Sequence, residues 1–345
     1  MPDLVASVSN ALAPLGFANV RPAGGAGTQT RRSIVLAAEC TEGTVAIKVL
    51  LPTVNDAYWL GAFHREGLIL EALREVEPVV HALAVNITLK PRVVGDFEIR
   101  YHVLEWASHD LQPLLGAVCA HEALSLVKQV CEAIDECHAR GIVHRDIKPG
   151  NVLISQGRVR LADFGASAFL ADPPLDPRGE VARYSWSCNR YHAPLEIHCG
   201  AGVERSAALA GDVWSLGAVL FELVSGKRLM AEMFTLEELK RFANLFRRAQ
   251  PDRGPDVLSE TLAHLNAAVS RPRISSPLIC ECTEALDLCA ALYMACTDFQ
   301  PWARPQSLLP WRQEIDAMLV SAGACTDEYA IRGRARTALE GRIEP

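Results

Sequence analysis

Apolar runs in the first third of the chain predict a β-rich region. Residues 33–50 are rich in Val, Ile, Leu and Ala, and Glu42-Gly43 interrupts them near the middle. Two apolar segments joined by a short turn that contains Gly are typical of paired strands. Residues 92–105 have strand character again and end in the stretch HVLEW.

One helix is predicted between these strands. Residues 64–74 show a helical pattern with Leu68, Leu70 and Leu73 as apolar positions.

Helical spacing dominates the remainder of the chain. Apolar residues recur every three or four positions over 124–138, and Gly141 is a suitable residue for ending a helix. Residues 235–238, TLEE, fit a capping box that begins another helix. Strands followed by helices predict an α+β fold with a small β-rich part and a larger helical part.

The length, composition and charge of the chain argue against several classes of function. The chain has 345 residues, half of them apolar, which is long enough for two lobes that share a cleft. Its net charge is 34 − 41 = −7, which argues against nucleic acid as the main partner. The N-terminus carries Asp3 and no basic region, so it makes a poor signal peptide. The sequence contains no run of 18 apolar residues, so a membrane span is not expected.

Eleven cysteines are expected to be free thiols in a reducing compartment. Cys282, Cys289 and Cys296 lie seven residues apart and share one face of a predicted helix. Cys280 and Cys282 form a C-x-C pair without a matching pair nearby, so buried thiols are favoured over a zinc site. We therefore expect the protein in the cytosol, and nothing here argues against entry into the nucleus.

Three motifs carry a resemblance to a known family. They are His144-Arg145-Asp146-Ile147-Lys148-Pro149-Gly150-Asn151, Asp163-Phe164-Gly165 and Val45-Ala46-Ile47-Lys48. They resemble the catalytic loop, the metal-binding triplet and the nucleotide-binding strand of eukaryotic-type protein kinases. The resemblance covers roughly residues 20–312 and implies a bilobal kinase-like fold.

The resemblance divides the chain into four parts. It implies an N-terminal extension over 1–19, a kinase N-lobe over 20–105, a C-lobe over 106–320 and a tail over 321–345. ATP, Mg²⁺ and a protein substrate are the implied partners, with no nucleic acid or membrane and no regulatory partner identified.

The first implied group holds the nucleotide phosphates. Lys48 would contact the α- and β-phosphates, oriented by Glu66, because 66 − 48 = 18 suits the kinase ion pair. Glu71 and Glu75 are alternative partners, and a merely solvated Glu66 is the competing interpretation.

The second implied group performs the transfer. Asp146 would accept the proton of the substrate hydroxyl, and Lys148 would meet the transferring phosphate. Asp163 and Asn151 would supply oxygen ligands to Mg²⁺. Lysine within the sequence D-I-K-P resembles serine/threonine kinases. The competing interpretation gives Asp146 and Asp163 buried structural roles.

The third implied group binds adenine. Residues 103–107, VLEWA, resemble the kinase hinge, with Leu104 at the back of the adenine pocket. Backbone groups of Glu105 and Ala107 would bond the adenine edge.

Two further motifs resemble structural parts of the C-lobe. The stretch GDVWSLG contains Asp212, which would anchor the catalytic loop backbone. Arg304 would form a buried pair with a Glu that closes the activation segment. That closing triplet reads Ala193-Pro194-Leu195-Glu196, so either the Glu is displaced by one residue or the pair is lost.

The glycine-rich loop departs from the family pattern. Counting back from Ile34 places Gly27, Gln29 and Arg32 at the three glycine positions, and no register gives three glycines. Side chains would crowd the phosphates, or Arg31 or Arg32 would contact a phosphate directly.

These departures support an alternative function, a pseudokinase that binds nucleotide or a partner. A small-molecule kinase is a third alternative, disfavoured by the activation segment and the GDVWSLG helix. Residues 188–191, CNRY, resemble the cyclin-dependent and mitogen-activated kinases only faintly, so no subfamily is assigned.

Arg145 before the catalytic Asp146 implies regulation by phosphorylation. In kinases with Arg at this position, the cation attracts an anion from the activation segment. Ser185 and Ser187 are the expected sites, with Tyr184 less favoured. A constitutive pair with Glu180 is the competing interpretation.

Overall fold

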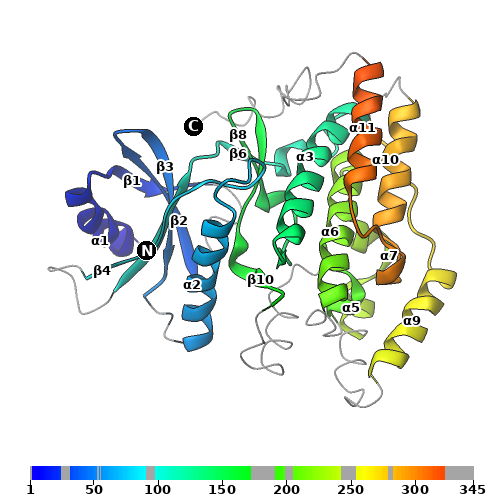
Figure 1. The fold of residues 1–345 in the computed structure, drawn as a ribbon, viewed down its shortest axis with the longest axis horizontal. Coiled ribbons are helices and arrows are strands. Elements are labelled where there is room, and N and C mark those ends of the chain that lie inside the picture. Colours follow the sequence, from blue (N-terminus) through cyan, green and yellow to red (C-terminus); the bar gives the residue numbers. More distant parts are fainter. Residues whose placement is uncertain are drawn as a thin grey trace. The chain divides into compact units, whose positions relative to one another are not determined.

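In the computed structural model, the chain forms two compact units, Met1–Ser108 and His109–Pro345. The boundary falls three residues after the one expected between the lobes. The structure describes residues 2–24, 32–52, 54, 56–90, 98–171, 191–198, 205–241, 254–278 and 283–322. Figure 1 gives the order of the elements along the chain.

Unit 1 is built on an antiparallel five-stranded sheet of order β1-β2-β3-β5-β4. Its strands are β1 Ala18–Pro22, β2 Ser33–Cys40, β3 Gly43–Leu50, β4 Ala82–Leu89 and β5 Ile99–Glu105. The predicted hairpin over 33–50 is confirmed as β2 and β3, whereas β1 and β4 were not predicted.

The predicted helix at 64–74 is longer than its apolar pattern suggests. Helix α2 spans Ala57–Ala72, and the side chain of Asp56 caps it by accepting from the Tyr58 N–H at 2.8 Å. Leu70 and Leu73 are buried as expected, but Leu68 is 48% exposed. A polar cap outside the apolar stretch therefore sets the beginning of this helix.

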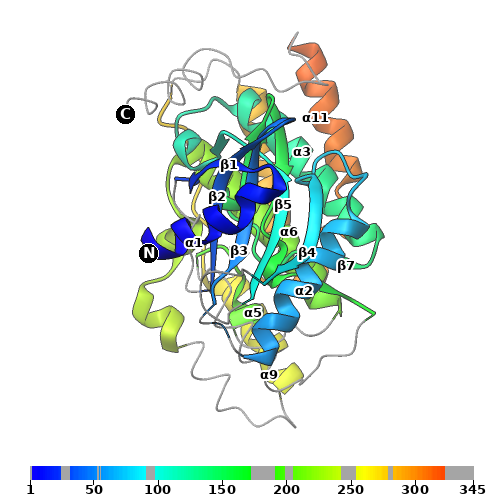
Figure 2. The ribbon, with the colours of Figure 1, turned by 90° about the vertical axis from the view of Figure 1, so that its left-hand side faces the viewer.

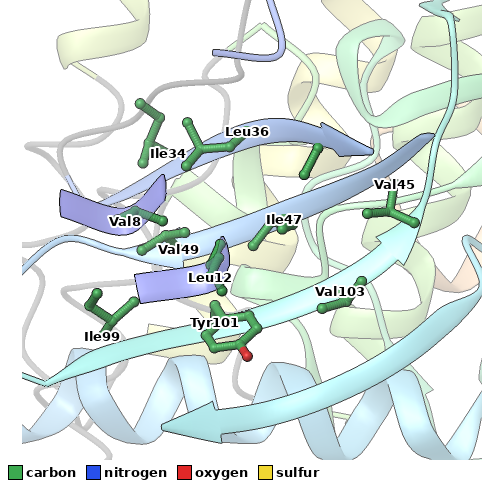
Figure 3. Packing of buried hydrophobic residues seen from close by; sticks show 11 residues of the cluster. Val8, Leu12, Ile34, Leu36, Val45, Ile47, Val49, Ile99, Tyr101 and Val103 are labelled. Carbon is green, nitrogen blue, oxygen red and sulfur yellow. The ribbon is translucent and has the colours of Figure 1, made fainter. Parts of the chain in front are cut away.

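A helix that was not among the predicted elements covers one face of the sheet. Helix α1, Pro2–Leu12, continues into the 3-10 turn η1, Ala13–Leu15. Its Val8 and Leu12 are fully buried against alternate residues of the central strands, including Ile47 and Tyr101 (Figure 3). Figure 2 shows α1 in dark blue, lying across the strands. Val8 and Leu12, within the extension expected over 1–19, therefore belong to the core of unit 1.

Helices dominate unit 2. They are α3 Ala120–Ala139, α5 Leu195–His198, α6 Arg205–Ser225, α7 Leu229–Met233, α9 Gly254–Ala268, α10 Thr283–Cys296 and α11 Leu309–Ser321. Short 3-10 turns are η2 Gln112–Leu114, η3 Pro149–Asn151, η4 Phe164–Ala166 and η7 Pro301–Ala303. The small strands are β6 His109–Asp110, β7 Ile142–Val143, β8 Val152–Ser155, β9 Arg158–Leu161 and β10 Ala168–Phe169. They form the sheets β6-β8-β9 and β10-β7.

Two predicted helix ends in unit 2 are confirmed. Gly141 follows α3 with φ +69°, the left-handed conformation in which glycine carries no steric penalty. Thr235 and Glu238 form the expected reciprocal capping bonds, and residues 236–241 are helical.

Helix α6 is the central helix of unit 2 and packs against both α3 and α10. A Cβ added at Gly217 would lie 2.6 Å from the Thr297 side chain, so glycine allows the close approach of α6 to the end of α10. Residues Ala207–Ser225 are long and apolar enough to span a membrane, but 94% of that window is buried inside the protein. This helix therefore behaves as a core helix.

Candidate active site

Lys48 is a buried cation in β3, and it pairs with Glu66 of α2. Lys48 Nζ lies 2.6 Å from Glu66 Oε1, and the two side chains are 10% and 3% exposed. Adjacent residues of β3 point to opposite faces, so Ile47 faces α1 and Lys48 faces α2. Of the alternative partners, Glu71 instead pairs with Arg74 at the surface, at 2.8 Å.

The end of β5 carries the residues expected to bind adenine. Leu104 is buried and lies opposite Ala46 of β3. Glu105 donates its N–H to the carbonyl of His81 at 2.9 Å, and its carboxylate accepts from the His81 N–H at 2.8 Å. The backbone N–H of Glu105 is thus already engaged within unit 1. Ala107 follows two residues later within the same unit.

The catalytic-loop sequence of unit 2 is anchored from below by Asp212 of α6. Its carboxylate accepts from the backbone N–H groups of His144 at 2.8 Å and Arg145 at 2.7 Å, which confirms the anchoring role expected for this aspartate. Burial raises the pKa of Asp212, but the bonds to His138 and His144 outweigh it, so the net pKa is lowered. His138, 3.0 Å away on α3, was not expected to take part.

His144 connects the loop to the triplet Asp163-Phe164-Gly165. Its Nδ1 accepts from the Asp146 N–H at 3.2 Å, so its Nε2 carries the proton and donates to the Ala162 carbonyl at 3.0 Å. Burial lowers the pKa of this imidazole, consistent with the neutral form. The ring also packs edge-on against Phe164, with centroids 4.7 Å apart.

Asp146 presents one carboxylate oxygen that the described part of the chain leaves without a partner. Its Oδ2 receives Lys148 Nζ at 2.5 Å and Asn151 Nδ2 at 3.1 Å. Its Oδ1 is buried and has no hydrogen-bond partner among the described residues. Burial raises the pKa of Asp146, and the nearby Lys148 partly offsets this. Such an oxygen is suited to accept a hydrogen bond from a ligand hydroxyl.

The oxygens expected to hold a metal come from Asn151 and Asp163. Asn151 donates its amide nitrogen to the carbonyl of Asp146 at 2.8 Å, which leaves its amide oxygen for another ligand. Asp163 adopts the left-handed conformation, φ +62°, directly before the 3-10 turn η4. Hard oxygens of this kind fit Mg²⁺. Within the described residues no cluster of three His, Cys, Asp or Glu side chains forms a metal site.

Glu196, displaced by one residue from the family position, still pairs with Arg304. Arg304 Nη1 lies 2.5 Å from Glu196 Oε1, and both side chains are fully buried. Arg304 also donates to the carbonyls of Ala210 and Asp298. Of the two possibilities left open by the triplet, displacement by one residue is therefore the correct one, and the buried pair is retained.

The positions expected for the glycine-rich loop fall in the sequence between β1 and β2. Gly27, Gln29 and Arg31 lie outside the described residues. Arg32 is described, and its guanidinium lies 3.3 Å from the ring centroid of Trp59 on α2. The structure thus gives Arg32 a cation–π partner within unit 1.

Replacing Arg32 with glycine is expected to lower the melting temperature slightly, because a cation–π contact contributes about 0.5–1 kcal/mol. We expect the KM for ATP to stay nearly constant, since Trp59 engages the guanidinium. Thermal unfolding and steady-state kinetics of Arg32→Gly measure the two effects. A clear rise in KM would instead support a direct phosphate contact.

Comparisons with known proteins agree with this geometry. A family model described as "Protein kinase domain" matches residues 25–282. The chain is 27% identical over 242 residues to Cyclin-dependent kinase F-4 of Oryza sativa subsp. japonica, covering 68% of this chain and 50% of the relative. It is 31% identical over 197 residues to Mitogen-activated protein kinase kinase 9 of Arabidopsis thaliana, covering 54% and 61%. It is 28% identical over 233 residues to Serine/threonine-protein kinases drp72 of Corynebacterium efficiens, covering 65% and 38%.

The chain therefore aligns with less than two thirds of the length of each of these relatives. Their names place them in different kinase groups, so they do not assign a subfamily to this chain.

Proposed function

This chain belongs to the protein kinase family, and from that premise we propose that it transfers the γ-phosphate of ATP to serine and threonine hydroxyls of proteins. The observation that carries the proposal is the buried Asp146 Oδ1, which has no partner within the described residues. A carboxylate held in this way can accept a substrate hydroxyl and orient its oxygen for attack.

The neighbours of Asp146 would prepare it for this role. Lys148 and Asn151 bind the other carboxylate oxygen, so the acceptor atom is fixed in direction. Lys148, in the sequence D-I-K-P, supports a serine/threonine substrate, and its ammonium would also neutralise charge on the transferring phosphate.

Unit 1 would supply the nucleotide contacts. Lys48, fixed by Glu66, would hold the α- and β-phosphates. The Glu105 carbonyl and the backbone of Ala107 would meet the adenine, beside Leu104. Bound Mg²⁺, held by Asp163 and Asn151, would neutralise phosphate charge.

The location of the protein is part of this proposal. The six described cysteines, Cys40, Cys119, Cys131, Cys137, Cys289 and Cys296, are all free thiols, which supports a reducing compartment such as the cytosol.

A pseudokinase is the second candidate, favoured by the irregular glycine-rich loop. The two candidates differ in phosphate transfer. Purified protein would be incubated with Mg²⁺, γ-labelled ATP and generic basic and acidic proteins, beside Asp146→Asn and the control Asp287→Asn. Asp287 is an exposed carboxylate on α10. We expect transfer by wild type and by the control only; an inactive wild type that still binds ATP would establish the pseudokinase.

Phosphorylation between Asp163 and Glu196 is expected to raise activity. A phosphate at Ser185 or Ser187, which lie outside the described residues, would give the Arg145 guanidinium a charge-assisted partner. Mass spectrometry of active protein should find the phosphate, and replacing both serines with alanine should lower kcat several-fold. An unphosphorylated segment with full activity in the double variant would show a constitutive kinase, as expected if Glu180 pairs with Arg145.

A further inference from the structure

A buried histidine lies beside Lys48 on the face of the sheet that α2 covers. His102 of β5 is directly opposite Lys48 of β3, so both side chains point to the same face. His102 is fully buried and stacks on the ring of Phe63 in α2, with centroids 4.0 Å apart and planes 10° apart. This residue is therefore in contact with the helix that carries Glu66.

Both ring nitrogens of His102 form hydrogen bonds, one as acceptor and one as donor. Nδ1 accepts from the backbone N–H of Asn86 at 3.0 Å, and a backbone N–H can only donate. Nε2 must therefore carry the proton, which it donates to the carbonyl of Phe63 at 3.2 Å. Burial, and then the charge of Lys48, lower the pKa of His102 to about 3, so the imidazole is neutral at physiological pH.

Asn86 binds the next carbonyl of the same helix. Its Nδ2 donates to the carbonyl of His64 at 3.1 Å, and its backbone has φ +56°, a conformation that asparagine tolerates better than most residues. Gly67 makes room for it: a Cβ at that position would lie 2.4 Å from Asn86 Nδ2. The absence of a side chain at Gly67 therefore permits the bond.

Two strands thus bind consecutive carbonyls of α2 within one turn of Glu66. Carbonyls in the middle of a helix ordinarily accept only from the residue four positions later. Additional donors from β4 and β5 oppose both rotation and sliding of the helix relative to the sheet.

We propose that His102 and Asn86 are positioning residues that fix α2 so that Glu66 remains paired with Lys48. The inference rests on the proposed phosphate transfer, since that pair would orient Lys48 toward ATP. Without the two bonds, α2 would be free to move and a smaller fraction of molecules would have the pair formed.

The test measures α2 directly and catalysis separately, in the full chain. Amide hydrogen exchange over Ala57–Ala72 is expected to accelerate about tenfold in His102→Leu and in Asn86→Gly, the size expected from losing buried hydrogen bonds. Exchange in α3 should not change. The kcat for phosphate transfer should also fall, by up to the same factor, because a smaller fraction of molecules then has the Lys48–Glu66 pair formed.

Matched variants separate positioning from general damage. His102→Gln retains a donor for the Phe63 carbonyl and should restore part of both effects. Asn86→Gly keeps the positive φ accessible, so it remains informative if His102→Leu does not fold. Gly67→Ala should destabilise the wild type by displacing Asn86, but should be neutral or stabilising in Asn86→Gly, where the clash is absent and alanine favours the helix.

Unchanged α2 exchange in His102→Leu and Asn86→Gly would overturn the proposal. Faster exchange with undiminished kcat in an active enzyme would do so as well. If the wild type transfers no phosphate, the proposed function fails, and the exchange measurements still decide whether the two residues hold α2.

Discussion

Lys48→Met and Asp163→Ala are each expected to reduce phosphate transfer by about 10²–10³-fold, the typical effect of removing one preorganised electrostatic contact in an active site. Lys48→Met removes the phosphate cation and leaves Glu66, which is 3% exposed, buried without its ammonium partner. Asp163→Ala removes a carboxylate ligand of Mg²⁺. Autophosphorylation and transfer to added protein would be measured with Mg-ATP.

The control for this experiment is Lys240→Met. Lys240 is exposed and forms a surface pair with Glu237, so its loss should leave transfer unchanged. Thermal unfolding of all variants shows whether they remain folded. Full activity in a folded Lys48→Met or Asp163→Ala protein would contradict the roles assigned to these residues.

Leu12→Ala is expected to destabilise unit 1 by about 2–5 kcal/mol, as large-to-small substitutions in a core do. Leu12 is fully buried between α1 and the sheet, in the same cluster as Ile47 and Tyr101 (Figure 3). Denaturant unfolding, followed with hydrogen exchange in β2 and β3 to assign the transition to unit 1, measures the change.

Leu15→Ala provides the matched control, because Leu15 lies only three residues away and is 51% exposed. It should change the free energy of unfolding far less. Equal destabilisation by the two substitutions would show that α1 does not contribute to the core as the structure indicates.

The parts of the fold that depend on short-range patterns could be predicted from the sequence. The hairpin over 33–50, the glycine after α3 and the capping box at Thr235 each have a local signal and were confirmed. Helix α1 also had a signal, since Leu4, Val5, Val8 and Leu12 repeat at helical spacing. Its role was missed because the second apolar face of the sheet becomes evident only when alternate residues of β2, β3 and β5 are assembled.

In the candidate site, too, residues with a local sequence signal could be predicted and the others could not. Lys48 could be identified from its strand motif and Glu66 from its separation of 18 residues, and the structure pairs the two side chains. Whether Glu196 pairs with Arg304 could not be predicted, because the local turn decides whether a glutamate displaced by one residue still reaches the arginine. His102 and Asn86 had no signal, since a histidine within a strand pattern is usually a satisfied core residue and its partners are distant in sequence.

Transfer of phosphate from ATP to protein hydroxyls is the activity that we propose for this chain. The most direct measurement is phosphoamino acid analysis of a protein substrate after incubation with the purified chain, γ-labelled ATP and Mg²⁺, with parallel samples that contain Asp146→Asn or lack the metal. We expect labelled phosphoserine and phosphothreonine in the complete wild-type sample and in neither of the others. Label that is absent from wild type, or equal in Asp146→Asn, would contradict it.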